Sequence, residues 1–168
     1  DGRVLLTGTP GRTVLPGLSL RGARNLDIAW VTVAPTRGDP VLQVGDALLH
    51  AADSDVRFFG TVVDGFDGSL DGIRVDSGRL AFHDGYVGGV GAGLAIGGGA
   101  ATDPEHAPRV TLARTLVDVS NDGIAKYGAG SLRVEGNYFY GRGGAWKHGG
   151  FLHADLLGQF QDAARGPV

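Results

Sequence analysis

The residues best suited to chemistry lie in the last third of the chain. Lys126 and His153 can act as bases, and Asp122 and Asp155 are carboxylates in similar local contexts. If "DGIAKY" (122–127) and "HADLL" (153–157) occupy equivalent positions in successive coils, Asp122 and Asp155 stack in register and Lys126 and His153 share a face. A base beside a cation can remove a proton next to a carboxyl group and stabilise the resulting enolate. Two carboxylates on facing strands can instead cleave a glycosidic bond. The predicted catalytic residues are therefore His153, Lys126, Asp155 and Asp122.

Aromatic and charged side chains surround this group in the sequence. Tyrosine and tryptophan offer flat faces against which a sugar ring can pack, while charged groups offer hydrogen bonds to hydroxyls. The predicted carbohydrate-binding residues are Tyr127, Tyr140, Trp146, Lys147, His148 and Glu135. Tyr138 aligns with apolar positions elsewhere in the chain and is expected in the core.

The aspartates also have a structural interpretation. Asp46, Asp71, Asp122 and Asp155 each stand where a strand is expected to begin after a turn. Aspartate at such a corner usually accepts hydrogen bonds from nearby backbone amides. A stack of these carboxylates could hold Ca²⁺, but the sequence marks no complete set of oxygen ligands. No metal site or cofactor is therefore predicted.

The elements that position these residues follow a repeat. Five segments share an apolar residue at their second position, another two residues later, and a further pair six and seven residues after the first apolar residue. They are 25–35, 55–65, 79–89, 109–119 and 131–141. Their first apolar residues are Leu26, Val56, Leu80, Val110 and Leu132. A second pattern alternates with the first: "DALLH" (46–50), "DGIRVD" (71–76), "AGLAIG" (92–97), "DGIAKY" (122–127) and "ADLLGQ" (154–159).

A unit of about 25 residues cannot bury its apolar side alone, so successive units must stack. Short strands with tight bends suit a coil of parallel strands, with neighbouring coils ~4.8 Å apart. In the last full segment, Glu135, Gly136 and Asn137 would form a corner between two strands. An antiparallel sandwich or barrel is the alternative, because several Asp-Gly pairs could form hairpin turns.

The strands beginning "DGI", the segment "LRVEGNYF" (132–139) and "HADLL" (153–157) resemble the pectate-lyase-like superfamily. The resemblance covers about residues 18–160 and implies an all-β, right-handed parallel β-helix of about five to six coils. We expect residues 1–168 to form this one domain. The superfamily includes lyases, hydrolases, epimerases, phage spikes and adhesins. In a lyase, the resemblance implies His153 or Lys126 as base, Lys147 or Arg133 as cation and Tyr140 as proton donor.

Composition narrows the class of protein. The net charge is −3, which argues against a nucleic-acid partner, and no apolar run is long enough to span a bilayer. Glycine accounts for 31 of 168 residues, well above the usual roughly 7%, and leaves little room for helices. The chain begins with Asp and has no cysteine. We expect it to be a trimmed or excised segment of a longer chain.

The function expected from these features is recognition of a polysaccharide along one side of the stack. The most specific form of this expectation is a glycan-binding spike or fibre of a phage-like particle, located outside the cell or on the particle surface. Bare strand edges at the ends favour a homotrimer or a capping subunit. The alternative is a pectate-lyase-like enzyme, a lyase, epimerase or hydrolase, acting on an acidic polysaccharide.

Overall fold

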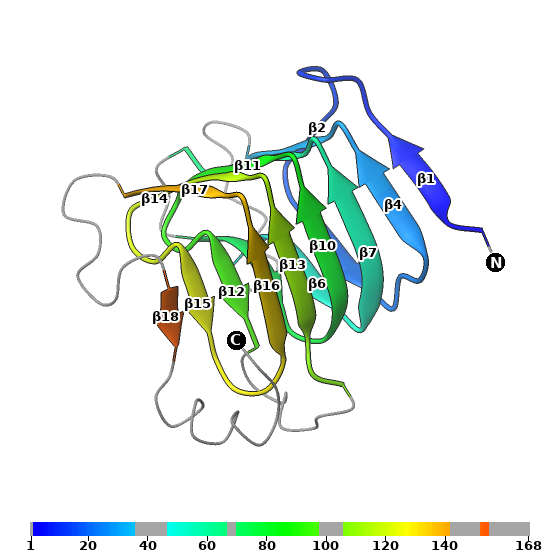
Figure 1. Cartoon of the computed structure of the whole chain (residues 1–168). Coiled ribbons are helices and arrows are strands. Elements are labelled where there is room, and N and C mark those ends of the chain that lie inside the picture. Colours follow the sequence, from blue (N-terminus) through cyan, green and yellow to red (C-terminus); the bar gives the residue numbers. More distant parts are fainter. Residues whose placement is uncertain (1, 36–46, 67–69, 98–105, 142–151, 155–168) are drawn as a thin grey trace.

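The computed structural model describes residues 2–35, 47–66, 70–97, 106–141 and 152–154. Every regular element within these ranges is a β-strand, and the eighteen strands form three six-stranded parallel sheets. Neighbouring strands in each sheet are three elements apart along the chain. Each coil therefore gives one strand to each sheet, and the chain is a β-helix of six coils (Figure 1).

The three sheets are named here by the order in which the chain enters them. Sheet A holds β1 (Val4–Thr7), β4 (Leu26–Ala29), β7 (Ser54–Phe59), β10 (Gly78–His83), β13 (Arg109–Ala113) and β16 (Ser131–Glu135). Sheet B holds β2 (Val14–Leu15), β5 (Thr32–Val33), β8 (Val62–Asp64), β11 (Tyr86–Val90), β14 (Leu116–Val119) and β17 (Tyr138–Gly141). Sheet C holds β3 (Leu18–Arg21), β6 (Ala47–Ala52), β9 (Asp71–Val75), β12 (Leu94–Ile96), β15 (Ile124–Lys126) and β18 (Leu152–Ala154).

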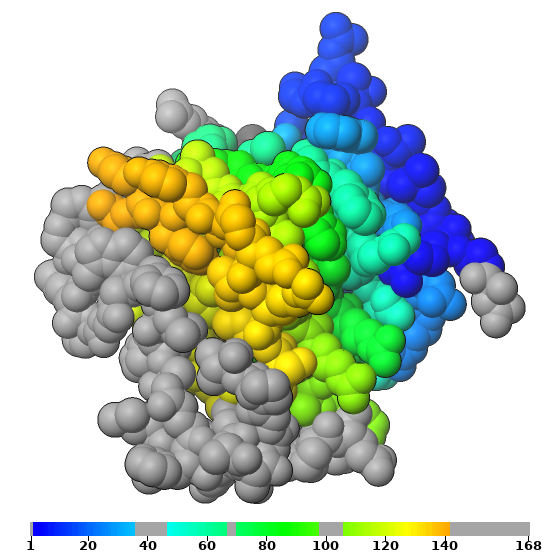
Figure 2. Space-filling view, viewed as in Figure 1, coloured from blue at the N-terminus to red at the C-terminus, as the bar shows by residue number. Residues whose placement is uncertain are grey.

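The predicted ladder of apolar residues is confirmed by the strand register. Leu26, Val56, Leu80, Val110 and Leu132 are in-register neighbours across sheet A. All the strand pairs within the described ranges are parallel, which excludes the antiparallel alternative. The coils succeed one another as bands of colour in the space-filling view (Figure 2).

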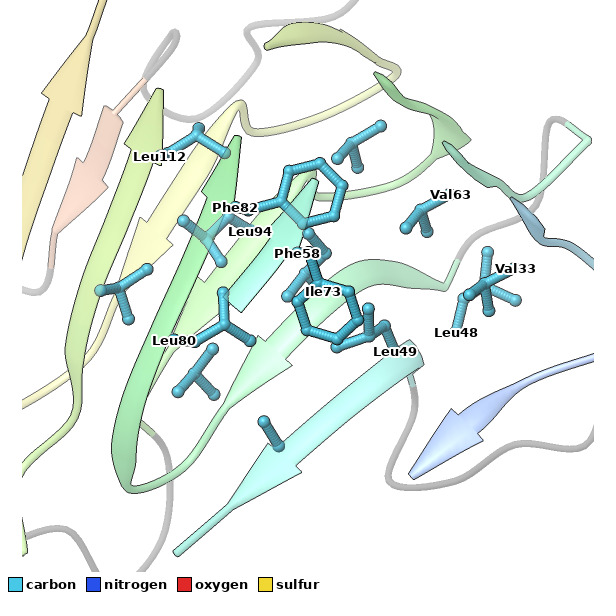
Figure 3. Packing of buried hydrophobic residues seen from close by; sticks show 14 of the residues in the cluster. Val33, Leu48, Leu49, Phe58, Val63, Ile73, Leu80, Phe82, Leu94 and Leu112 are labelled. Carbon is cyan, nitrogen blue, oxygen red and sulfur yellow. The ribbon is translucent and has the colours of Figure 1, made fainter. Parts of the chain in front are cut away.

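The core follows from strict alternation along each strand. In β7 the residues alternate between buried and more exposed, so Val56 and Phe58 point inward while Arg57 points outward. Phe58 and Phe82 are in register on neighbouring strands, fully buried, and their ring centroids are 5.8 Å apart. Figure 3 shows their side chains among Leu80, Ile73 and other aliphatic residues of the interior.

The corner between sheets A and B has the same backbone conformation in five coils. Residues at this corner have positive φ angles between 48° and 60°, in the left-handed region: Trp30, Gly60, Asp84, Arg114 and Gly136. Residues 135–137 therefore form this corner in the sixth coil, as predicted. Glycine is well suited to this conformation, whereas the other residue types carry some strain there.

The second repeating pattern is confirmed in four coils and wrong in the last. Leu49, Ile73, Leu94 and Ile124 are in register across sheet C. When the quoted segments are aligned on their first residues, Leu48 falls opposite Ile73, so the observed register differs by one residue in "DALLH". In the last coil the strand is Leu152–Ala154, and Leu152 pairs with Ile124. The prediction instead used "ADLLGQ" (154–159), which has a similar apolar pattern and begins two residues after Leu152.

A search of the described residues for helices long and apolar enough to cross a membrane finds none.

Candidate functional site

The predicted catalytic residues on β15 and its leading turn are buried. Lys126 is 1% exposed, points inward with Ile124, and donates a hydrogen bond from Nζ to the carbonyl oxygen of Gly128 at 2.8 Å. Asp122 is 4% exposed, and its Oδ2 accepts a hydrogen bond from Asn121 Nδ2 at 3.3 Å. Catalysis on a polymer requires contact with the surface, so the burial of these two side chains argues against a catalytic role for either of them.

The register of the last coil also separates the predicted pairs. His153 lies opposite Ala125 and Lys126 lies opposite Ala154, so Lys126 and His153 do not occupy one position in the sheet. The expectation that they share a face assumed a different register and is wrong on this point. Because Leu152 pairs with Ile124, the alignment that placed Asp155 on Asp122 does not hold either. Asp155 itself lies outside the described residues.

The three predicted carbohydrate-binding residues that the structure describes lie on different sides of the stack. Tyr127, after β15, and Tyr140, on β17, are exposed, as expected. Glu135 ends β16, where its Oε1 accepts a hydrogen bond from Arg133 Nε at 2.7 Å. Trp146, Lys147 and His148 lie outside the described residues. The expected cluster is therefore not formed by those members that the structure describes.

The prediction that Tyr138 lies in the core is wrong. Tyr138 is 66% exposed on the outer face of sheet B, in register with Leu116, and does not enter the core. Its neighbour Phe139 is the residue that packs against the core. The two residues alternate across the strand, and the larger, more polar one faces outward.

A hollow on the outer face of sheet A is the better candidate for a binding site. Ala81 is one of the residues that line it, at an outward position of β10, and the small side chain leaves space between its longer neighbours. Arg57 of β7 and Thr111 of β13 flank Ala81 in register. The hollow has a volume of about 480 Å³ and reaches Ser131 on β16.

A second hollow of about 390 Å³ adjoins the first, towards the corner between sheets C and A. Asp55, Arg79 and Arg109 line both hollows. Gly78 lies at this corner with a φ of +87°, and a Cβ there would stand 2.3 Å from the carbonyl oxygen of Ser54. The corner can turn this tightly only with glycine, and it brings Arg79 onto the outer face.

Ion pairs across the coils fix one end of this face. Asp27 accepts hydrogen bonds from Arg57 Nε and Nη2 at 2.8 and 2.6 Å and from Arg3 Nε at 2.6 Å. The hydrogen bonds with Arg57 and then Arg3 outweigh the effect of burial and lower the pKa of Asp27 from 3.8 to about 2. Asp55 is bound by Arg3 Nη1 at 3.1 Å.

Aromatic rings mark the edge of the face next to sheet B. Phe59 and His83 are in register and stacked, with centroids 5.4 Å apart and an angle of 13° between the rings. The Arg57 guanidinium carbon is 5.7 Å from the centroid of the Phe59 ring. Burial, with a smaller contribution from the charge of Arg114, lowers the pKa of His83 and favours the neutral imidazole.

Two arginines in the centre of the site have no carboxylate partner among the described residues. Arg79 and Arg109 are exposed and in register on β10 and β13, and no ion pair or hydrogen bond joins either guanidinium to another described residue. Neither arginine was among the residues predicted from the sequence. The available signal was their shared place in the repeat, one residue before Leu80 and Val110, where a strand residue faces outward.

Metal binding finds no support in the part of the chain that the structure describes. No group of three or more histidine, aspartate or glutamate side chains is arranged there to hold an ion. The polar side chains that line the first hollow are mostly hydrogen-bond donors, namely guanidinium and hydroxyl groups, together with the carboxylate of Asp55.

Comparisons with family models, with curated proteins and with solved structures return no match for this chain.

Proposed function

We propose that the chain is a polysaccharide-recognising module and that the polymer lies on the outer face of sheet A. The observation that carries this proposal is the pair of adjoining hollows over β7, β10 and β13, the first of which also reaches β16. Their shared lining makes one elongated binding surface across four successive coils, a shape that suits a chain of sugar units.

The chemistry of the lining supports the same ligand. Arg57, Arg79 and Arg109 present guanidinium donors, while Thr111 and Ser131 present hydroxyls that both donate and accept hydrogen bonds. Sugar hydroxyls and ring oxygens are the complementary groups. The side chains project from regular strands, so little ordering is required on binding, which favours affinity.

The broader biological setting is part of the proposal. The parallel β-helix agrees with the resemblance to the pectate-lyase-like superfamily, whose members include glycan-binding spikes. We propose a spike or fibre component of a phage-like particle, acting outside the cell or on the particle surface, with homotrimer formation or a capping subunit at the stack ends. The molecular mass in solution tests the trimer.

The enzyme hypothesis stays a prediction. A lyase would generate a conjugated double bond, so incubation with a uronate polymer followed by ultraviolet absorbance detects it directly. Loss of that signal in His153→Ala would assign the base. A polymer that is bound and recovered intact supports the binding module.

The proposed location is tested by filling the first hollow without changing its charge. Ala81→Trp places a large side chain between Arg57 and Thr111, so it should abolish binding to whichever polysaccharide the protein selects from an immobilised glycan panel. Thr32→Trp, at an outward position on sheet B, is the matched control and should bind like the wild type. Equal binding by Ala81→Trp and the wild type would contradict the proposed location.

A further inference from the structure

The arginines on and beside sheet A divide into two groups by their partners. Most of those around sheet A are held by carboxylates: Arg3 and Arg57 by Asp27, Arg24 by Asp53, Arg114 by Asp84 and Arg133 by Glu135. Arg79 and Arg109 make no such contact among the described residues. They are also the two arginines that line both hollows.

The carboxylate in register with Arg79 does not form an ion pair with it. Asp55 is in register with Arg79 on the neighbouring strand, yet it forms its ion pair with Arg3 from the first coil. On the other side, the in-register neighbour of Arg109 is Ser131, which carries no charge. The column therefore runs Asp55, Arg79, Arg109, Ser131, with two like charges at its centre.

Two arginines side by side on neighbouring strands repel one another, because in-register positions are only ~4.8 Å apart along the sheet. A bound anion removes that repulsion, since a single oxyanion can accept hydrogen bonds from both guanidinium groups. The planar fork of donors on arginine matches the oxygens of a carboxylate or a sulfate.

We infer that Arg79 and Arg109 together bind one oxyanion group of the polysaccharide, a uronate carboxylate or a sulfate ester. This inference rests on the proposed function and adds the substrate class: the polymer is acidic, and its charged group sits where the two hollows meet. Ser131, next in the column, is placed to donate a further hydrogen bond to the same group or its sugar.

The test compares polymers that differ only in charge. Polygalacturonate and its fully methyl-esterified form carry the same backbone, and dextran sulfate and dextran form a second pair that distinguishes sulfate from carboxylate recognition. Affinities are measured by titration calorimetry for the wild type, Arg79→Gln, Arg109→Gln and the double variant. Arg12→Gln/Arg21→Gln, which removes two exposed arginines away from the hollows, is the control of equal net charge.

We expect the wild type to prefer one of the charged polymers over its neutral counterpart and to lose roughly tenfold in affinity for each hollow arginine removed. The control double variant should keep nearly the full affinity. Equal binding of charged and neutral polymers, or the same loss in the control as in Arg79→Gln/Arg109→Gln, would overturn the inference. Circular dichroism confirms that each variant is folded.

Failure of the inference is distinguishable from failure of the proposed function. Binding of a neutral polymer that depends on Ala81 but not on Arg79 and Arg109 would leave the function standing and reject the oxyanion site. A thermal shift with inorganic sulfate that is lost in the double variant, with no polymer bound, would support the oxyanion site and reject the glycan. No binding of any polymer and no sulfate shift would reject both.

Discussion

The side chain of Asn137 is bonded twice to the backbone of the preceding coil. Its Oδ1 accepts a hydrogen bond from the Thr115 backbone nitrogen at 2.8 Å, and its Nδ2 donates to the Leu112 carbonyl oxygen at 2.7 Å. The amide thereby satisfies backbone groups at a corner where the strand ladder is interrupted. This contact ties the sixth coil to the fifth.

Replacing Asn137 by alanine should lower the free energy of unfolding by roughly 1–3 kcal/mol, because two backbone groups lose their partner. Asn137→Asp keeps an acceptor for Thr115 but cannot donate to Leu112, so its effect should also be destabilising. Urea denaturation followed by circular dichroism measures both. A wild-type midpoint for Asn137→Ala would show that the corner does not depend on this amide.

Two glycines with positive φ allow steric crowding to be separated from backbone strain. A Cβ at Gly78 would lie 2.3–3.1 Å from backbone atoms of Ser54, whereas a Cβ at Gly22, with a φ of +67°, would meet open space. Gly22→Ala should cost about 1–2 kcal/mol from the left-handed conformation alone. Gly78→Ala should cost more, since the backbone of β7 or β10 must also shift. Thermal denaturation of the two variants checks the order, and an equal loss would contradict it.

The aromatic pair in the core should dominate local stability. Phe82 is completely buried against Phe58, so Phe82→Ala is expected to reduce the free energy of unfolding by about 3–5 kcal/mol. Leu116→Ala, at a 40% exposed position on sheet B, should change it by only about 0.5 kcal/mol. Chemical denaturation compares the two. Similar losses would mean that the alternation of inward and outward positions is misassigned.

The ion pairs of Asp27 predict that part of the stability of the fold is lost in acid. Its folded pKa of about 2 lies below the ordinary 3.8, so the carboxylate stabilises the fold above pH 3.8 and loses that contribution as the pH falls towards 2. Because water reaches the Arg57 side chain, the contribution should be roughly 1 kcal/mol. Asp27→Asn should therefore flatten the stability profile in this pH range. An unchanged slope would contradict the assignment.

The fold could be predicted because the apolar pattern repeats with small variation in spacing. Leu26, Val56, Leu80 and Val110 begin nearly identical segments, and stacking is the arrangement that buries them all. The last coil was misplaced because Leu152 and Leu156 both fit an apolar strand start, and local pattern alone does not choose between them. Tyr138 was misassigned although the second residue of each pair, such as Val33 or Val63, marks the inward position.

The binding face was harder to predict than the fold. The sequence places Arg79 and Arg109 on the outside of their strands, but whether they find partners within the described part of the chain depends on which arginine each aspartate binds. Asp55 pairs with Arg3, which is distant in the chain and adjacent only because of the first coil. Likewise, Lys126 comes two residues after Ile124 in β15 and therefore lies on the same inward side of the strand. The prediction of a catalytic role for Lys126 did not take this alternation into account.

The proposed site requires an acidic sugar unit to bind the outer face of sheet A at Arg79 and Arg109. The decisive measurement is a crystal structure with the preferred acidic oligosaccharide, either a short oligogalacturonate or a sulfated oligosaccharide. We expect density over Ala81, with carboxylate or sulfate oxygens within hydrogen-bonding distance of both guanidinium groups. An oligosaccharide bound at sheet B, at sheet C or at the end of the stack, with both arginines facing solvent, would contradict the proposal.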